Sequence, residues 1–220
     1  TKNCLKESML LQYLDQLSNE RQEVFKRLKH VSKNFVLAGG TAIMLQIGHR
    51  LSYHFDCFSK HTLSPNLLRQ IKKVFGVFIS PRVQTSEQIA FATRDGIEVT
   101  FVCHPYKSLQ KIINTDFMPL FSLDDLAANK AYVIGRRGVW RDYVDIFFFL
   151  KWNLYSIEKI STLAKKKFTG EFNEKLFLEQ LVYFDDLIIV PIVFIKESYE
   201  EKEIKSFLEK KVEEYVQKRI

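Results

Sequence analysis

A glycine pair constrains the fold of this chain more than any other feature of its sequence. Residues 35–38 form a short apolar run that ends at Gly39-Gly40, and from residue 42 to residue 47 the pattern is helical. The sequence therefore predicts a strand, a tight turn and a helix in direct succession. Such a junction gathers backbone N–H groups and a helix N-terminus at one point, which attracts phosphate, although a glycine pair also serves in plain tight turns.

Short strands and helices alternate around that junction in the first half of the chain. Strand character is found at residues 53–58, 77–83, 88–93 and 97–103, and helical spacing at residues 5–17, 19–29 and 64–75. The turn Arg94-Asp95-Gly96 between the last two strands is typical of a hairpin. We expect an α+β fold with a small mixed sheet flanked by helices.

The second half of the chain is nearly all helical in pattern. Ser122 is a suitable N-cap for a helix that continues to residue 134, and a glycine-containing break follows. Further helices are predicted over residues 141–152, 157–167, 173–182 and 199–220. We therefore expect two domains, a mixed α/β domain of residues 1–120 and a helical C-terminal domain of residues 121–220.

Composition narrows the function classes only slightly. The chain has 33 Lys and Arg against 26 Asp and Glu, a net charge of +7 and a pI near 9.2, which favours polyanions such as nucleotides or nucleic acid. Its three cysteines have neither a CxxC pair nor zinc spacing, so a structural zinc site and a disulfide framework are not expected.

No membrane-spanning or secretory segment is expected. The strongest apolar runs, residues 146–150 and 187–195, fall far short of the roughly 18 residues that a span needs. The N-terminal segment lacks the features of a signal peptide and has the spacing of an amphipathic helix. With the odd cysteine count, these features predict a reducing cytoplasmic location.

Polar residues on two of the predicted strands form a candidate metal site. His54 and Asp56 project from one face of residues 53–58, and Glu98 and Thr100 project in the same way from residues 97–103. Carboxylates that converge beside a phosphate-binding turn suit Mg²⁺-dependent phosphoryl or nucleotidyl transfer, because the metal takes oxygen ligands and bridges to the phosphates.

Two segments together resemble a known family. The segment LAGGTAIMLQIGHRLSYHFDCFS resembles the signature of the AbiEii/AbiGii-type nucleotidyltransferase toxins, which belong to the DNA polymerase β-like nucleotidyltransferase superfamily, and SLDDLAANKAYVIGRRGVWRDYVDIFFFL resembles their downstream motif. The resemblance implies a bacterial enzyme of an abortive-infection toxin–antitoxin system. It would use Mg²⁺ or Mn²⁺ to transfer a nucleotidyl group from an NTP to an RNA (tRNA) or protein acceptor, and an antitoxin protein is a possible partner.

The resemblance assigns roles to individual positions. The residues implied in nucleotide binding are Gly39, Gly40, Thr41, Arg50, Ser52, Lys130, Arg141, Asp142 and Asp145. Those implied in catalysis are Asp56, Glu98 and Lys130, and those implied in metal binding are His54, Asp56 and Glu98. The family pattern is loose in the strand that carries Glu98. In the competing register, Thr100 takes the position that is otherwise assigned to Glu98.

This sequence departs from the family pattern at one position, where His54 replaces the first of two paired carboxylates. Imidazole serves Mg²⁺ poorly, whereas Mn²⁺ and Zn²⁺ accept it. The site could work with an altered metal preference, bind nucleotide with little catalysis, or use other acids in compensation. A buried structural histidine is a further alternative, and the alternative function is a catalytically degenerate protein that binds nucleotide, nucleic acid or a partner.

The downstream motif also has a structural alternative. Asp142 and Asp145 lie three residues apart on a predicted helix, so they could cap its first turn and pair with Arg136, Arg137 or Arg141. Lys130 would reach nucleotide phosphates as a point charge.

Overall fold

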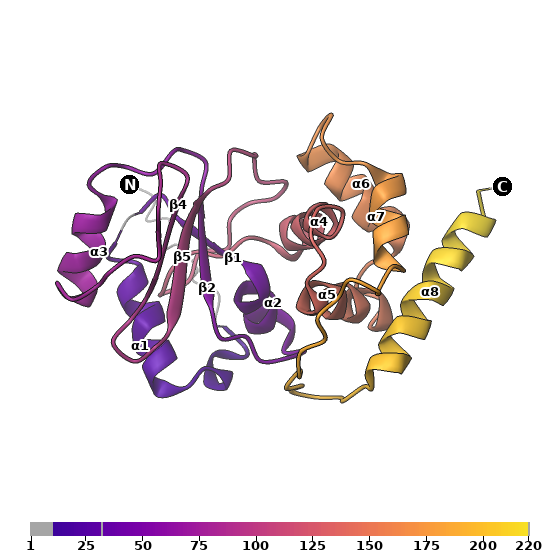
Figure 1. Cartoon of the computed structure of the whole chain (residues 1–220), viewed down its shortest axis with the longest axis horizontal. Coiled ribbons are helices and arrows are strands. Elements are labelled where there is room, and N and C mark those ends of the chain that lie inside the picture. The colour runs from indigo at the N-terminus through magenta and orange to yellow at the C-terminus, as the bar shows by residue number, and fades with distance from the viewer. Residues whose placement is uncertain (1–10, 32, 220) are drawn as a thin grey trace, which may run out of the picture. The chain divides into compact units, whose positions relative to one another are not determined.

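The computed structural model describes residues 11–31 and 33–219. The chain divides into two compact units, Thr1–Ser122 and Leu123–Ile220. The first unit contains a five-stranded mixed sheet with helices, and the second contains five helices in its described residues. Figure 1 shows this succession along the chain. The predicted fold class, a mixed sheet with helices followed by a helical half, is confirmed.

The sheet of the first unit has the strand order β1-β2-β5-β4-β3. Its strands are β1 (Val36–Ala38), β2 (Phe55–Ser59), β3 (Val83–Gln84), β4 (Gln88–Ala92) and β5 (Glu98–Cys103). Strand β2 runs parallel to β5, and the other neighbouring pairs are antiparallel. Because parallel neighbours need a crossover, the chain between β2 and β5 includes a helix and the β3–β4 pair before it returns to the centre of the sheet.

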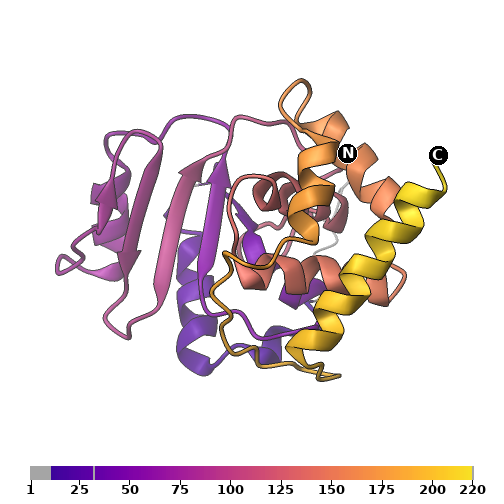
Figure 2. The same cartoon turned by 45° about the vertical axis from the view of Figure 1, so that its right-hand side comes forward.

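Two helices cover one face of this sheet. The helices of the unit are α1 (Asn19–Leu28), α2 (Gly39–Ile47) and α3 (Leu67–Phe75). The Phe25 ring of α1 stacks on Phe55 of β2 with centroids 5.7 Å apart, and Phe75 of α3 lies 5.7 Å from Phe91 of β4. Figures 1 and 2 both show α1 and α3 on the same side of the strands. The alternation of buried and half-exposed residues in β2 and β5 leaves polar side chains on the opposite face.

Four local predictions for this unit need correction. The predicted strand over residues 77–83 is wrong, because the chain turns after Gly76, at φ +107°, and only Val83–Gln84 pairs with the sheet. Val77 and Phe78 are instead 84% and 57% exposed. Strand β2 begins one residue after His54, and α2 begins at Gly39 without a separate turn. Of the predicted helix over residues 5–17, residues 5–10 lie outside the described residues and residues 14–16 form a 3₁₀ turn.

The helices of the second unit agree with their predicted ranges to within about two residues, except at the C-terminal end of the last one. They are α4 (Leu123–Ile134), α5 (Trp140–Lys151), α6 (Ile157–Lys167), α7 (Glu174–Leu181) and α8 (Glu201–Gln217). Side chains cap α6, α7 and α8, since Ser156 accepts from the Lys159 amide, Asn173 from the Leu176 amide and Glu203 from the Glu200 amide. Within the described residues no helix is both long and apolar enough to cross a membrane.

A buried ion pair connects α4 to α6. Lys167 Nζ donates to Asp125 Oδ1 at 2.7 Å, and both side chains are fully buried. Burial lowers the pKa of Lys167, and the hydrogen bond and charge of Asp125 only partly oppose this effect. The Asp125 carboxylate thus stabilises the Lys167 ammonium group, whose charge would otherwise be costly to bury.

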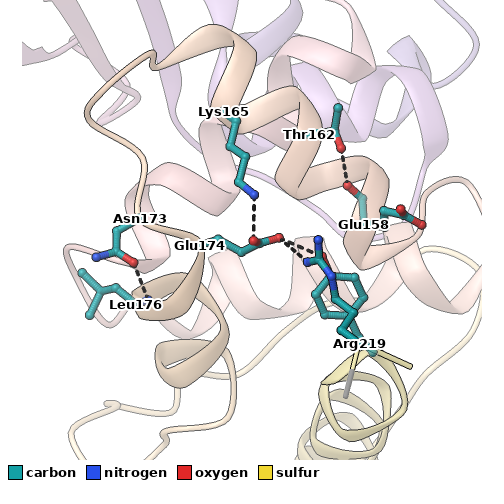
Figure 3. A network of polar contacts seen from close by, with 8 residues as sticks. Glu158, Thr162, Lys165, Asn173, Glu174, Leu176 and Arg219 are labelled. Carbon is teal, nitrogen blue, oxygen red and sulfur yellow. Dashed lines mark hydrogen bonds and ion pairs between the residues drawn. The ribbon is translucent and has the colours of Figure 1, made fainter. Parts of the chain in front are cut away.

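Glu174 joins three helices of this unit. Its carboxylate accepts from Lys165 Nζ of α6 at 2.7 Å and from the Tyr215 hydroxyl of α8 at 2.7 Å, and Arg219 Nη1 lies 3.2 Å away (Figure 3). Burial by itself raises the pKa of Glu174. The hydrogen bonds from Lys165 and Tyr215, with the charges of Lys165 and Arg219, outweigh burial and lower that pKa to about 2.

We expect Glu174→Gln to lower the free energy of unfolding of the protein by about 1 kcal/mol at neutral pH, because the substitution removes the charge that Lys165 and Arg219 face. The pKa in the folded state, about 2, lies below the ordinary value of 4.5. The stabilisation is therefore present above pH 4.5 and disappears as the pH falls toward 2. Urea unfolding of both proteins across this pH range measures the difference.

Glu179→Gln on the same helix is the matched control. Glu179 is 58% exposed and lies 3.7 Å from Lys175, so its removal should change stability little at any pH. Equal effects of the two substitutions would contradict the role assigned to Glu174.

Candidate functional site

The site in the first unit begins at the N-terminus of α2, where the backbone meets a carboxylate. Gly39 is the first residue of the helix and has φ +65°, and a Cβ atom added there would lie 2.1 Å from Asp56 Oδ2. Only glycine allows both this backbone conformation and this approach. The start of α2 and the Asp56 carboxylate are therefore in direct proximity.

The second glycine makes room for a cation and a hydroxyl group. A Cβ atom at Gly40 would lie 2.7 Å from Arg50 Nη2 and 3.1 Å from Ser52 Oγ. Arg50 is 3% exposed, and its Nη1 donates to the Leu51 carbonyl at 3.1 Å. The guanidinium group is thus held beside the first turn of α2.

Thr41 connects this turn to the segment that leads into β2. Its hydroxyl group donates to Ser52 Oγ at 2.9 Å and also contacts the backbone carbonyl of His54. Thr41 is 1% exposed. Because these bonds are partly shielded from water, they fix the segment between Arg50 and Asp56 against α2.

The strand register places Asp56 beside small side chains. Asp56 pairs with Ala38 of β1 on one side and with Thr100 of β5 on the other, and Thr100 in turn pairs with Ala90 of β4. Asp56 and Thr100 are half-exposed, in contrast to the buried residues that flank them in each strand. Asp56 therefore stands on the sheet face opposite to α1 and α3, with small side chains beside it in the neighbouring strands.

Glu98 and His54 form a second polar group on this face. His54 Nε2 lies 3.2 Å from Glu98 Oε2, and Arg82 forms an ion pair with Glu98 Oε1. The side chains of His54 and Glu98 are 44% and 38% exposed, so the alternative of a buried structural histidine is wrong. Both oxygens of Glu98 are engaged. No pattern in the sequence points to Arg82, because its contact with Glu98 arises only from the pairing of β3, β4 and β5.

The described residues contain no group of three or more His, Cys, Asp or Glu side chains that could hold a metal ion. The set His54, Asp56 and Glu98 is therefore not assembled around a common point. The Asp56 carboxylate suits Mg²⁺ or Mn²⁺, and Mg²⁺ commonly takes one or two carboxylates together with substrate phosphates. Glu98 would have to leave Arg82 and His54 before it could act as a ligand.

A separate charged cluster lies in the helical unit. Lys130 Nζ of α4 lies 2.5 Å from Asp142 Oδ1 and 2.6 Å from Asp145 Oδ2 of α5. All three side chains are less than 10% exposed. The predicted pairing of Asp142 with an arginine is found with Arg137, at 3.4 Å, but the main partner of both carboxylates is Lys130. The ammonium group is thus committed to two carboxylates.

Arg141 differs from Lys130 in its surroundings. It lies in the first turn of α5 and is half-exposed. Within the part of the chain that the structure describes, its guanidinium group has no acidic partner at ion-pair distance. Arg141 is therefore the motif residue of this unit that has positive charge available for an anion.

The order and geometry of these elements agree with a protein family. Residues 25–218 match the model of the AbiEii family, described as a nucleotidyl transferase toxin of a type IV toxin–antitoxin system. The chain belongs to the AbiEii nucleotidyltransferase toxin family. The resemblance in the two sequence segments is confirmed, and with it the toxin–antitoxin class of the family.

Individual relatives of this AbiEii-family chain are distant. An uncharacterized protein of Aquifex aeolicus (strain VF5) is 29% identical over 213 residues, which cover 91% of this chain and 98% of the relative. MenT4, a nucleotidyltransferase toxin of Mycobacterium tuberculosis H37Rv, superposes with a TM-score of 0.60 at 12% identity, covering 86% of this chain and 78% of MenT4. A Helicobacter pylori protein described as a candidate nucleotidyltransferase has a TM-score of 0.54 at 17% identity, with 92% and 97% covered. These structural matches show a shared fold.

We expect Gly39→Ala to abolish the nucleotide binding that the family resemblance predicts, because the new methyl group would displace Asp56 or the start of α2. Gly96→Ala is the matched control, since Gly96 has φ +73° and nothing lies within 4 Å of its added Cβ atom. Gly96→Ala should lower the free energy of unfolding by only about 1–2 kcal/mol, through backbone strain, and leave binding intact. Calorimetric titration with NTPs and thermal unfolding test both variants, and equal loss of binding would contradict the close approach at Gly39.

We expect Lys130→Ala to destabilise the protein by about 3–5 kcal/mol, because it leaves two buried carboxylates without their cation. Arg141→Ala should change stability by less than about 0.5 kcal/mol, as a substitution of a partly exposed residue without an ion pair. Denaturant unfolding of the two variants gives the comparison. Similar stabilities for Lys130→Ala and Arg141→Ala would show that Lys130 has no structural role.

Proposed function

We propose that this chain binds an NTP and transfers its nucleotidyl group to an acceptor hydroxyl group. The observation that carries the proposal is the close approach at Gly39, where the N-terminus of α2 meets the Asp56 carboxylate. A group that attracts phosphate and a group that attracts a cation thus lie side by side. This pairing is what a metal–nucleotide complex requires.

In this proposal the first turn of α2 binds the nucleotide phosphates. Backbone N–H groups at a helix N-terminus have no partner within the helix, and the helix dipole adds positive potential there. Arg50, beside Gly40, adds a fixed positive charge, and the hydroxyl groups of Thr41 and Ser52 lie at the same turn. Arg141 in the helical unit stays the predicted further contact to phosphate.

Asp56 would hold a divalent cation, Mg²⁺ or Mn²⁺, together with the phosphates of the nucleotide. The bound cation supplies positive charge that offsets the negative charge developing around the reacting phosphorus. Asp56 supports this role because it is half-exposed and has only Ala38 and Thr100 as neighbours in its row of the sheet. These small neighbours leave space for a ligand above the strand.

The reaction forms a bond from the acceptor hydroxyl oxygen to the α-phosphorus. The bond from the α-phosphorus to the oxygen that bridges to the β-phosphate breaks, and pyrophosphate and a proton are released. The chain contributes by positioning and by fixed charge. Arg50 and the α2 N–H groups are held in place before the nucleotide arrives, so little reorganisation is needed. We propose that the modified acceptor harms the cell and that an antitoxin protein counteracts this toxicity in the cytoplasm.

A second candidate function is nucleotide or partner binding without catalysis. The observation that favours it is the state of Glu98, which is paired with Arg82 and with the histidine that replaces the first family carboxylate. Metal binding with a single carboxylate would be weaker than with two.

A transfer assay with labelled NTPs on total RNA and on total protein tests the proposed chemistry. We expect transfer by the natural protein and a loss of about 10²-fold or more in Asp56→Asn, since this variant keeps the shape of the side chain but loses its charge. Thermal unfolding confirms that Asp56→Asn is folded. No transfer with any of the four NTPs, in Mg²⁺ or in Mn²⁺, would exclude the enzymatic proposal.

His54→Asp separates the two candidate functions. If the site is degenerate, restoring the carboxylate should raise metal-dependent nucleotide affinity and transfer above the level of the natural protein. If the site already works with histidine, the substitution should lower transfer in Mn²⁺ more than in Mg²⁺, because imidazole suits Mn²⁺ better. Titration of the natural protein with NTP and each metal supplies the baseline.

A further inference from the structure

The net positive charge of the chain lies entirely in its first unit. Of the 33 Lys and Arg residues, 16 are in residues 1–122 together with 9 of the 26 acidic residues. The remaining 17 basic residues of residues 123–220 are matched by 17 acidic ones. The excess of +7 is thus a property of the α/β unit.

A long segment of this unit has no acidic residue at all. Between Asp56 and Glu87 there is neither Asp nor Glu, whereas Lys60, Arg69, Lys72, Lys73 and Arg82 are basic. Within the described residues only Arg82 of these five forms an ion pair, with Glu98. The other four cations are not neutralised by the protein.

Three of these cations share the outer face of α3. Leu67, Ile71 and Phe75 form the buried stripe of the helix, which faces the sheet. Lys72 and Lys73 follow Arg69 at three and four residues, so both are neighbours of Arg69 on the remaining surface. Arg69 and Lys73 are exposed and Lys72 is half-exposed.

The neighbouring helix α1 extends this cluster. Arg27 of α1 donates to the Val74 carbonyl of α3 and lies 4.9 Å above the Phe75 ring, which brings the C-terminal halves of the two helices together. Lys26 of α1 and Lys29, which follows its last residue, are exposed, and Lys29 Nζ donates to the Asp116 carbonyl at 2.9 Å. The acidic residues Glu20 and Glu23 are nearer the beginning of α1. We call Lys26, Lys29, Arg69, Lys72 and Lys73 the α1–α3 basic surface.

Two exposed apolar residues follow directly after α3. Val77 is 84% exposed and Phe78 is 57% exposed. The Phe78 ring lies against Gly76, where an added Cβ atom would be 2.4 Å from it, so its position is fixed by the turn. An exposed aromatic ring beside unneutralised cations is a combination that stacks on unpaired bases.

The lysines of the helical unit show a different pattern. On α7 and α8, Lys175 pairs with Glu179, Lys205 with Glu201 and Lys211 with Glu214. Three surface lysines of the helical unit are therefore paired within their own helix. The absence of such pairs on α3 leaves its cations free to exchange bound counterions for phosphates.

We propose that the α1–α3 basic surface binds the phosphate backbone of RNA, with Phe78 stacking on an unpaired base. RNA fits better than duplex DNA because its loops and ends present unpaired bases. The surface lies on the sheet face opposite to Asp56 and takes no part in the proposed chemistry. This inference rests on the proposed function where it takes RNA as the acceptor. The binding of RNA to the surface does not itself require nucleotide.

The test measures binding of fluorescently labelled polyuridylate and labelled total tRNA, without NTP, over a series of salt concentrations. The triple variant Arg69→Ala, Lys72→Ala, Lys73→Ala should bind both RNAs about tenfold or more weakly. It should also reduce the slope of log affinity against log salt by about 2, as expected for three phosphate contacts to a single strand. Phe78→Ala should weaken polyuridylate binding at an unchanged salt slope.

Lys205→Ala, Lys210→Ala, Lys211→Ala on α8 is the matched control, with the same change of net charge. It should leave RNA affinity and salt slope unchanged, and thermal unfolding verifies that both triple variants are folded. An equal loss in the control, or no loss in the α3 variant, would overturn the inference. Binding to vesicles with anionic headgroups but not to RNA would overturn it as well.

Two further readouts keep this inference separate from the proposed function. Asp56→Asn should bind RNA like the natural protein even if no nucleotidyl transfer exists. The α3 triple variant should bind NTP like the natural protein but lose RNA binding. Loss of RNA binding in Asp56→Asn would place the RNA at the Asp56 face and contradict the α1–α3 basic surface.

Discussion

The approach of the α2 N-terminus to the Asp56 carboxylate is the constraint on which the site in the α/β unit depends. It requires a residue without Cβ at Gly39, and it requires the antiparallel register that pairs Ala38 with Asp56. The same geometry brings Arg50 and Ser52 against Gly40, where Thr41 ties them to the helix. One strand pairing thus assembles a helix N-terminus, a guanidinium group and a carboxylate.

The two units manage charge in different ways. In the helical unit, buried charges are matched internally, as in the pairs of Lys130 with Asp142 and Asp145 and of Lys167 with Asp125. Such pairs are costly to desolvate, and removing one partner is costlier still, so they maintain a specific arrangement of α4, α5 and α6. In the α/β unit, exposed cations on α3 have no such partners, and this unit carries the whole net charge.

His54 changes the charge of the sheet face that carries Asp56. In place of a second carboxylate beside Asp56, the imidazole lies against Glu98, and Arg82 occupies the other oxygen of Glu98. The face therefore has less negative charge than two paired acids would provide. Both candidate functions depend on this difference, because the divalent cation that would accompany the nucleotide is attracted by carboxylates and repelled by positive charge.

The sequence by itself determined the fold class, most helices, the glycine junction and the family, because these depend on periodicity and local motifs. Tertiary structure decided the partners of the polar residues. Arg82 reaches Glu98 through the pairing of three strands, and Lys130 meets Asp142 and Asp145 through the packing of α4 against α5. The prediction of a strand over residues 77–83 failed for the same reason. Apolar residues form a strand only where a partner strand is available, and Val77 and Phe78 have none in the described sheet.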